Sequence, residues 1–226
     1  KVQGKFIRGM LCLALYEGCG GDRLEEYIPG AVAVELVHRT SLLFDDIQDR
    51  GSMRNGRPTV SFLHGDAQAI NVGLALSCYP RLALLRLPDR AIAQSVQGCL
   101  EEATIELCGG QWMDLAREEE SRDYYHEMIR RKTGILMGTA TEVGALMGGG
   151  ASGQARVFGE ALGMAFQIQD DILGIWGDPA SMGKEANDLE EGKVTLPVIL
   201  AKEQGLKTLT PSAMRDAGIL DATIEL

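Results

Sequence analysis

The sequence predicts an all-α fold, and three observations support this prediction. Aromatic residues make up only 5% of the chain, runs of β-branched residues are rare, and apolar residues recur at spacings of three and four along most of it. Hydrophobic residues make up 45% of the 226 positions, which is enough for one sizeable core. No repeat of solenoid period and no low-complexity linker divides the sequence. We therefore expect residues 1–226 to form a single domain.

The helical pattern is clearest in residues 31–44, and breaker residues separate the segments that follow. Residues 31–44 carry apolar side chains almost all round, as in the central helix of a large bundle. Residues 51–58 (GSMRNGRP) are dense in breakers and predict a loop, while residues 88–89 and 148–153 predict shorter connections between helices. Residues 178–192 are polar and contain a proline and two glycines, which predicts a long exposed loop and a candidate lid.

The charge balance restricts the classes of partner. The chain has 32 acidic and 22 basic residues, so its net charge of -10 opposes nonspecific binding to nucleic acid or to an anionic membrane. A polyanionic ligand therefore requires a local basic cluster or bridging cations. The five cysteines show no metal-binding spacing and predict a reducing, cytoplasmic location. No apolar run reaches the roughly 18 to 20 residues that a membrane span needs.

Two acidic clusters are the strongest chemical signal. Asp45, Asp46 and Asp49 end an apolar helix, and residues four apart on a helix share a face, so Asp45 and Asp49 can converge on one ion. Asp170 and Asp171 follow a second apolar helix in the same way. The alternative is a solvated patch at each helix end, but acids there oppose the helix macrodipole. Two such clusters suggest a two-walled magnesium site.

Basic residues lie beside these clusters and beside breakers, where they can bind a diphosphate. Arginine chelates phosphate oxygens through two donors and lysine acts as a point charge, whereas the acidic clusters reach the same oxygens only through metal ions. The alternative for any one of them is a solvated surface charge. The set comprises Lys5, Arg8, Arg50, Arg54, Arg57, Lys132, Lys184 and Lys193.

Five motifs, in order, resemble those of the trans-isoprenyl diphosphate synthases, the polyprenyl synthetase family. They are GKFIRG, DDIQDRGSMRNGRPT, RRKTG, FQIQDDILGIWGD and GKEANDLEEGKVTLPV, and together they extend over nearly all of the chain. Five motifs in the right order are far more specific than one aspartate-rich motif. The resemblance implies a single large helical bundle of the isoprenoid synthase type around a deep apolar cavity, with the acidic clusters facing each other across its mouth.

The resemblance also implies a role for each matching residue. Magnesium ions would be held by Asp45, Asp46, Asp49, Asp170 and Asp171. The allylic diphosphate would be contacted by Arg54, Lys132 and Lys193, and isopentenyl diphosphate by Lys5, Arg8 and His38. Thr133 and Gln167 would line the reacting carbons, and Lys184 would be a lid lysine. Gln111 and Asp114 resemble a family motif at the cavity mouth, with a structural hydrogen bond as the equal alternative.

By this resemblance the chain would catalyse magnesium-dependent head-to-tail transfer of a prenyl group to isopentenyl diphosphate, and it would form a homodimer. Members of the family set product length by the residues four and five positions before the first aspartate, which here are the small Ser41 and Thr40. Tyr79 on the following helix is a further candidate for the cavity floor. Small residues at both positions favour a twenty-carbon product, geranylgeranyl diphosphate.

Departures from the family pattern keep two alternatives open. Asn55 replaces a second arginine, and Gly174 replaces the third aspartate of the second motif. We also expect some of the family's N- and C-terminal helices to be absent from this sequence. One alternative is a class I terpene cyclase, which would carry an Asn-x3-Ser-x3-Glu cluster that is not found after Phe166. The other is a regulatory subunit that has lost catalysis.

Overall fold

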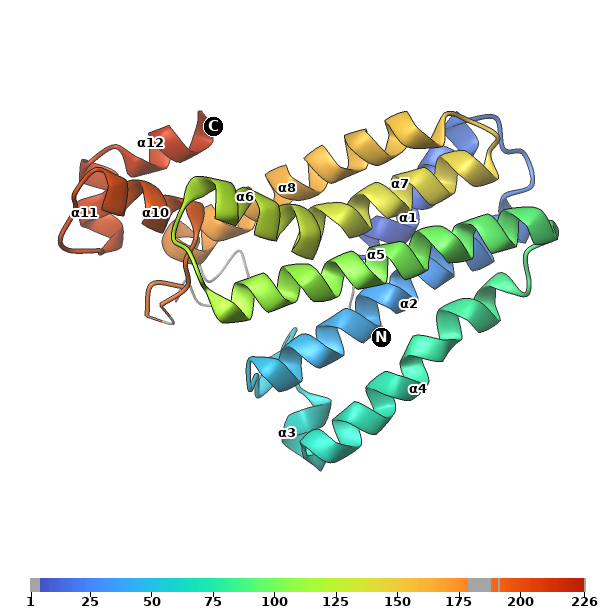
Figure 1. Cartoon of the computed structure of the whole chain (residues 1–226), viewed down its shortest axis with the longest axis horizontal. Helices are drawn as coiled ribbons and strands as arrows, with labels where there is room; N and C mark the ends of the chain where they lie inside the picture. The colour runs from blue at the N-terminus through green and yellow to red at the C-terminus, as the bar shows by residue number, and fades with distance from the viewer. Residues whose placement is uncertain (1–4, 179–187, 191, 226) are drawn as a thin grey trace.

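The computed structural model describes residues 5–178, 188–190 and 192–225, and their regular secondary structure is helical apart from one short hairpin (Figure 1). The all-α prediction is confirmed. The first half contains α1 (Ile7–Gly18), α2 (Leu24–Gln48), β1 (Met53–Arg54), β2 (Arg57–Pro58), α3 (Val60–His64), α4 (Asp66–Leu84) and α5 (Arg90–Ala116). The second half contains α6 (Arg122–Ile129), the π-helical turn η1 (Arg130–Gly134), α7 (Ile135–Met147), α8 (Ser152–Trp176), α10 (Leu196–Glu203), α11 (Pro211–Asp216) and α12 (Ile219–Ile224).

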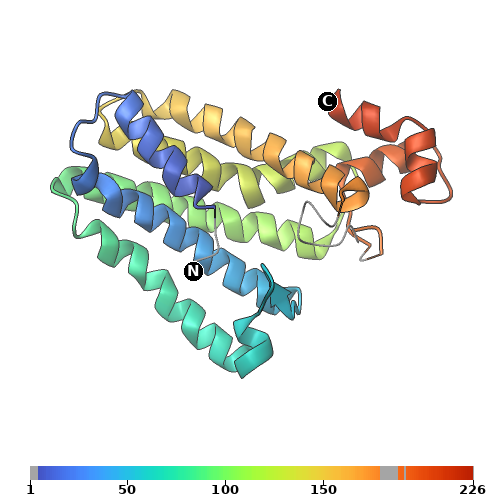
Figure 2. The ribbon, with the colours of Figure 1, turned by 180° about the vertical axis from the view of Figure 1, so that it is seen from behind.

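Helix α7 is the centre of the bundle. It packs against α1, α2, α5 and α8 (Figures 1 and 2). Most of its side chains are buried, which explains why apolar residues lie on all faces of this helix. Glycines allow its close approach to two neighbours. A Cβ at Gly144 would lie 2.1 Å from the carbonyl oxygen of Cys12 in α1, and one at Gly159 of α8 would lie 2.2 Å from Thr141 Oγ1. Any larger residue at either position would therefore push the helices apart.

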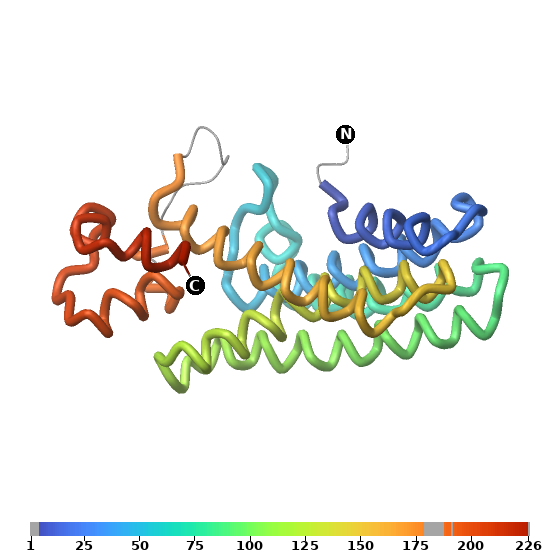
Figure 3. Tube along the Cα trace, turned by 90° about the horizontal axis from the view of Figure 1, so that it is seen from above, coloured from blue at the N-terminus to red at the C-terminus, as the bar shows by residue number. Residues whose placement is uncertain are grey.

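Two apolar clusters stabilise different ends of the molecule. The larger joins α1, α2, α5 and α7 and includes Tyr16, Val34 and Leu136. The smaller joins α6 and the end of α8 to α10, α11 and α12, with Leu196 and Met214 fully buried. Figure 3 shows the C-terminal helices gathered at one end of the long bundle. The functional candidates Lys132, Asp170 and Lys193 lie in the elements that connect these two clusters.

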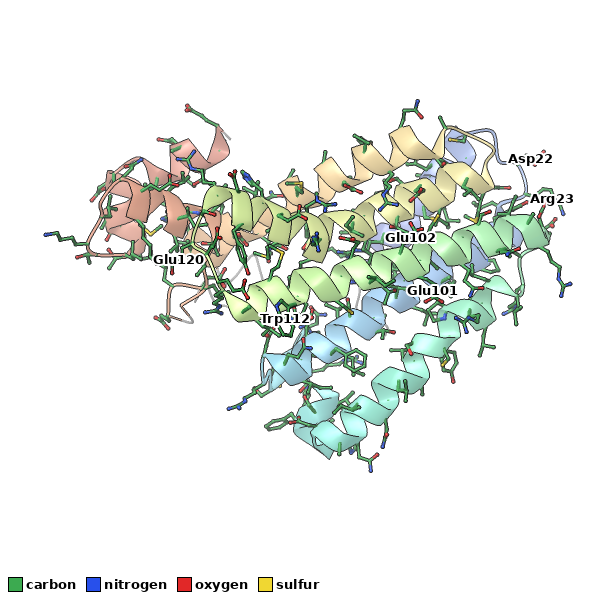
Figure 4. All side chains as sticks on the ribbon, in the orientation of Figure 1. Asp22, Arg23, Glu101, Glu102, Trp112 and Glu120 are labelled. Atoms are coloured by element: carbon green, nitrogen blue, oxygen red, sulfur yellow. The ribbon has the colours of Figure 1, made fainter. Side chains whose placement is uncertain are left out.

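Helix α4 diverges from the rest of the bundle. It joins α5 through residues 85–89 and moves away from α5 toward α3 (Figure 1). Arg81 Nη2 of α4 lies 2.8 Å from Oε1 of Glu101 on α5, and Figure 4 labels Glu101. Its main partner is α2, where Gly73 makes room for the ring of Phe44. The short connections predicted at 88–89 and 148–153 fall between α4 and α5 and between α7 and α8, and both are confirmed.

The segment predicted as a loop over 51–58 is in part a two-stranded antiparallel hairpin, which corrects that prediction. Met53 pairs with Pro58 and Arg54 with Arg57. Asn55 and Gly56 form its turn with φ of 51° and 72°, and a turn with two positive φ values favours Asn-Gly. The helices formed by the described residues include none with both the length and the apolar content needed to cross a membrane.

Candidate active site

Three carboxylates, those of Asp45, Asp46 and Asp49, lie at the C-terminal end of α2. Asp45 is partly buried, and burial raises its pKa, with the negative charges of Asp49 and Asp114 acting in the same direction. The positive charges of Lys132 and Arg54 oppose this shift. Asp45 is therefore a carboxylate that the fold places among other acids and close to two cations. A group of this kind is stabilised when a further cation binds.

The hairpin that follows α2 returns a basic side chain to the same cluster. Arg54 Nε donates to Asp46 Oδ1 at 2.6 Å, and the Asp46 side chain is only 13% exposed. Thr59 closes the base of the hairpin, because its Oγ1 donates to the carbonyl of Gly51 at 2.6 Å. The left-handed conformation of Asn55 forms the hairpin turn, and the hairpin places Arg54 beside Asp46 of α2.

The π-helical turn η1 carries Lys132 and Thr133. Arg130 and Arg131 both donate to Glu127, and the hydrogen bond from Arg130 is the largest cause that lowers the pKa of Glu127 to about 2. Lys132 instead binds the carboxylate of Asp114 on α5. Its ammonium also acts on Asp45, so it lies between the ends of α2 and α5. A π-helical turn inside a longer helix is frequently found at a functional site.

A hydrogen-bonded chain links η1, α8 and α6; we call this group the α8 wall and the C-terminal end of α2 with the hairpin the α2 wall. Thr133 Oγ1 donates to Gln167 Oε1 at 2.8 Å, and Gln167 Nε2 donates to Asp171 Oδ1 at 2.9 Å. Tyr125 Oη donates to Asp171 Oδ2 at 2.6 Å. Burial raises the pKa of Asp171 to about 6, although both donors act to lower it. Both carboxylate oxygens of Asp171 are therefore used inside the protein, and Asp170 is the partly exposed member of the pair.

Sequence reasoning missed Tyr125 and Asp188, which hold predicted residues in place. Tyr125 is 2% exposed and belongs to the apolar pattern of α6, so only its contact with Asp171 reveals its role. Asp188 is buried, and its Oδ1 accepts a hydrogen bond from Lys193 Nζ at 2.8 Å. A polar loop sequence gave no sign that this acid is buried. Lys184 lies outside the described residues.

The predicted isopentenyl diphosphate residues lie where α1 meets α2. Arg8 Nη1 lies 3.2 Å from His38 Nε2. Burial, with the positive charges of Arg8, Arg39 and Arg54, lowers the pKa of His38 to about 3, so its neutral ring accepts from Arg8. Burial also lowers the pKa of Arg8, and its Nε is a buried donor without a hydrogen-bond partner among the described atoms. A bound anion would favour the charged form of this guanidinium. Lys5, just before α1, is exposed.

The predicted chain-length residues occupy two different environments. Thr40 and Ser41 are partly buried on α2, and their hydroxyls donate to the carbonyls of Leu36 and His38 at 2.9 Å each. These side chains therefore satisfy their polar groups within the helix and offer small apolar surfaces. Tyr79 is 54% exposed on α4, so it does not close an internal floor within this chain. The effect of Tyr79 on product length stays a prediction.

The residues present fit a magnesium ion that is shared with a bound diphosphate. No group of three or more His, Cys, Asp or Glu side chains within the described ranges converges to form a complete metal cage. Magnesium often binds through one or two carboxylates and takes its other ligands from water and substrate phosphates. Asp45, whose ionised form is disfavoured by burial and by Asp49, supplies a donor of the required hard type. Asp46 and Asp171 already have protein partners.

Comparisons with known proteins extend over nearly the whole chain. The sequence profile of the polyprenyl synthetase family matches residues 1–216. The chain is 37% identical over 213 residues to a short chain isoprenyl diphosphate synthase of Methanothermobacter thermautotrophicus, covering 89% of this chain and 64% of that protein. It thus spans less than two thirds of the length of that relative.

Relatives from one organism carry different product names. A geranylgeranyl diphosphate synthase of Mycobacterium tuberculosis is 37% identical, with 97% of this chain and 67% of that protein covered. A (2E,6E)-farnesyl diphosphate synthase of the same species is 42% identical, with 86% and 56% covered. Among solved structures, a Caulobacter crescentus polyprenyl synthase complexed with calcium and isoprenyl diphosphate matches with a TM-score of 0.85 and 29% identity, covering 99% of this chain and 75% of that chain.

Proposed function

Because the chain belongs to the polyprenyl synthetase family, we propose that it is a trans-prenyltransferase that condenses isopentenyl diphosphate with an allylic diphosphate. One observation carries this proposal: Arg54 donates to Asp46 at 2.6 Å, and Arg54 and Lys132 both act on the neighbouring Asp45. Acids and cations grouped in this way can bind a diphosphate with its metal ions. The product is a longer trans-polyprenyl diphosphate. Its length, which the names of the relatives leave open, we propose to be twenty carbons.

The basic residues bind the leaving diphosphate. Lys132 on η1, Arg54 on the hairpin and Lys193 before α10 approach from three separate elements, so their charges can surround one polyanion. Asp114 and Asp46 hold the first two in place. A divalent metal ion, for which Asp45, Asp49 and Asp170 are the proposed ligands, would add Lewis-acid stabilisation of the same leaving group when bound.

The other wall accommodates the positive charge that develops on the allylic carbons. Gln167 Oε1 accepts from Thr133 Oγ1, which fixes both neutral oxygens without adding a fixed positive charge. Asp171 orients Gln167 from behind by accepting from its amide. Neutral oxygens held in place can stabilise a cation with little reorganisation. We propose that Thr133 and Gln167 serve in this way, and that Asp171 and Tyr125 act by positioning them.

Isopentenyl diphosphate binds at the junction of α1 and α2 in this proposal. Arg8 and Lys5 contact its diphosphate, and the neutral His38 can donate one ring hydrogen to it while the other nitrogen accepts from Arg8. The low pKa of His38 makes it a poor base. The proton that leaves the condensed product is therefore assigned to the released diphosphate.

The test of the proposed function is an elongation assay. Purified protein is incubated with magnesium, isopentenyl diphosphate and a series of allylic diphosphates, and the products are sized. Elongated linear diphosphates support the proposal. A cyclic hydrocarbon from a single substrate would point to a terpene cyclase, and turnover only after addition of a second polypeptide would point to a regulatory subunit.

Product length is tested by Thr40→Phe. An aromatic ring one turn before Asp45 should fill the space beyond the allylic site and shift the main product to a shorter chain. Ser41→Phe provides the neighbouring comparison, and Thr40→Ser is the matched control because it keeps the hydroxyl and adds no volume. An unchanged product distribution in Thr40→Phe would show that this position does not limit the chain.

We also propose that the protein forms a homodimer through α4 and α5. Both helices expose large apolar side chains, including Leu74, Ile105 and Trp112, which are 66%, 71% and 71% exposed (Figure 4 shows Trp112). Their burial against a second copy would remove this surface from water. Light scattering coupled to size-exclusion chromatography measures the mass directly, and a monomer at micromolar concentration would contradict the proposal.

A further inference from the structure

We propose that Asp188 is the positioning residue for Lys193, and that Gly174 is required because the Asp188 carboxylate occupies the space of any side chain at position 174. Lys193 acts on the diphosphate in the proposed function, and the inference rests on that role. Asp188 Oδ1 accepts from Lys193 Nζ at 2.8 Å. The Asp188 side chain is 9% exposed and that of Lys193 is 47% exposed. A fixed carboxylate thus holds an ammonium that a ligand can reach.

Gly174 provides the space for this carboxylate. A Cβ at position 174 would lie 1.8 Å from Asp188 Oδ2 and 2.5 Å from its Cγ, far inside van der Waals contact. The backbone is joined at the same point, since the Asp188 amide donates to the carbonyl of Gly174 at 3.2 Å. Residue 188 therefore docks on α8 through both its backbone and its side chain. Even an alanine at position 174 must displace it.

A backbone hydrogen bond joins Lys193 to Asp188, and Arg117 at the end of α5 binds the residue before Lys193. The Lys193 amide donates to the carbonyl of Asp188 at 3.0 Å. Arg117, in a left-handed conformation at the end of α5, donates from Nη1 to the carbonyl of Gly192 at 3.0 Å. Asp114, three residues earlier, binds Lys132. The end of α5 therefore fixes both lysines relative to each other, and Asp188 fixes the direction of the Lys193 side chain.

This arrangement gives the glycine of the second acidic motif a steric role, which is to leave room for Asp188. An acid at position 174 would not simply add a metal ligand to this chain, because its side chain and that of Asp188 would compete for one space. It would also add a negative charge beside Asp188, Asp170 and Asp171, which already interact. We therefore expect Gly174→Asp to weaken function in this chain.

The experiment measures binding of inorganic diphosphate with magnesium by calorimetry, alongside KM for the allylic diphosphate and kcat. Asp188→Ala should weaken diphosphate binding on the order of tenfold, and raise KM similarly, because Lys193 loses a charged hydrogen bond that orients it. In a Lys193→Ala background the same change should have no further effect on diphosphate binding. Additive losses in the double variant would overturn the positioning role.

Gly174→Ala tests the steric part independently. It should weaken diphosphate binding about as much as Asp188→Ala, on the order of tenfold. Gly153→Ala is the matched control, because Gly153 lies on the same helix and a Cβ there meets nothing within 4 Å. If Gly174→Ala and Gly153→Ala bind diphosphate with the same affinity, the requirement for glycine at position 174 would be overturned. If Gly174→Ala fails to fold, the Asp188 and Lys193 variants still decide the proposal.

These outcomes separate this inference from the proposed function. A wild-type chain that elongates no prenyl diphosphate, yet binds diphosphate in a manner that depends on Asp188 and Lys193 together, would contradict the function and support the positioning role. A wild-type chain that elongates normally, with diphosphate binding unchanged in Asp188→Ala, would support the function and overturn the positioning role. A change in melting temperature alone in Asp188→Ala would also overturn it.

Discussion

The two aspartate pairs look alike in the sequence and differ in the structure. Asp45 and Asp46 end α2, and Asp170 and Asp171 lie near the end of α8, each after an apolar segment. On α2 the acids face the cations Arg54 and Lys132. On α8, Asp171 is 6% exposed and accepts hydrogen bonds from Tyr125 and Gln167. The first pair thus lies beside cations, whereas Asp171 of the second pair is hydrogen-bonded inside the protein.

The neighbouring elements explain this difference. After α2 the chain turns into the hairpin, and Asp45 and Asp46 remain partly exposed there. At α8, by contrast, α6 and α10 pack against the acidic turn and exclude water from Asp171. An acid that is excluded from water needs donors, and Tyr125 and Gln167 supply them. Two aspartate pairs that look alike in the sequence can therefore differ in burial and in hydrogen-bond partners.

The largest expected effect is on turnover and comes from the α2 wall. Asp45→Asn should lower turnover by about 100- to 1,000-fold, because it removes a charge that stabilises the leaving group through the metal ion. Its free energy of unfolding should not fall, since burial raises the pKa of Asp45 and the ionised form is disfavoured in the folded protein. Steady-state kinetics and urea unfolding of the same variant measure both quantities.

The exposed Asp22, in the loop between α1 and α2 (Figure 4), supplies the control for this prediction. Asp22→Asn changes the net charge equally and should leave turnover and stability unchanged. Near-normal turnover in Asp45→Asn would mean that the α2 wall does not act on the diphosphate, and the comparison between the walls would fail.

The next effect is on stability and comes from the α8 wall. Tyr125→Phe removes the hydroxyl that donates to Asp171 and leaves a buried acceptor unsatisfied, so it should lower the free energy of unfolding by about 1–3 kcal/mol. Turnover per folded molecule should change far less than in Asp45→Asn. Tyr124→Phe is the adjacent control, since its hydroxyl donates to the carbonyl of Met113 and not to an acid. If Tyr125→Phe lowered turnover without lowering the free energy of unfolding, the structural role assigned to the α8 wall would be wrong.

The third effect appears only when the pH is lowered and comes from the α2 side. His38 has a pKa of about 3 in the folded protein and about 6.5 when unfolded, so between these values the unfolded chain binds more protons. Wild-type stability should therefore fall as the pH is lowered below 6.5, by up to about 1.4 kcal/mol per pH unit from this group. The His38→Gln variant should lose less stability than the wild type between pH 6.5 and 4. Denaturant unfolding measures the free energy of unfolding of both proteins.

The exposed His64 at the end of α3 is the control for the pH prediction. His64→Gln should follow the wild-type curve. Parallel curves for wild type and His38→Gln would mean that the fold tolerates a charged His38 beside Arg8. The α8 wall contributes in the opposite sense, because the raised pKa of Asp171 favours folding at low pH, and both variants retain that contribution.

The sequence predicted the helical class, the two acidic clusters and the connections at 88–89 and 148–153, because each depends on residues close together in the chain. The predicted loop at 51–58 was incomplete. Its Asn-Gly pair is a hairpin signal, but the strands that it joins have only two residues each. The predicted site residues remain predictions, although the structure brings Thr133 next to Gln167 and Arg8 next to His38.

The sequence by itself determined the helical class and several breaks between helices, because helical periodicity relates residues three and four apart. The tertiary structure decided which acids are buried, because Tyr125 and Asp171 are 46 positions apart and no local pattern relates them. It also decided why residue 174 is a glycine, because the absence of a side chain there leaves room for the carboxylate of Asp188. Burial and steric exclusion depend on everything that surrounds a residue, and only the folded chain specifies those surroundings.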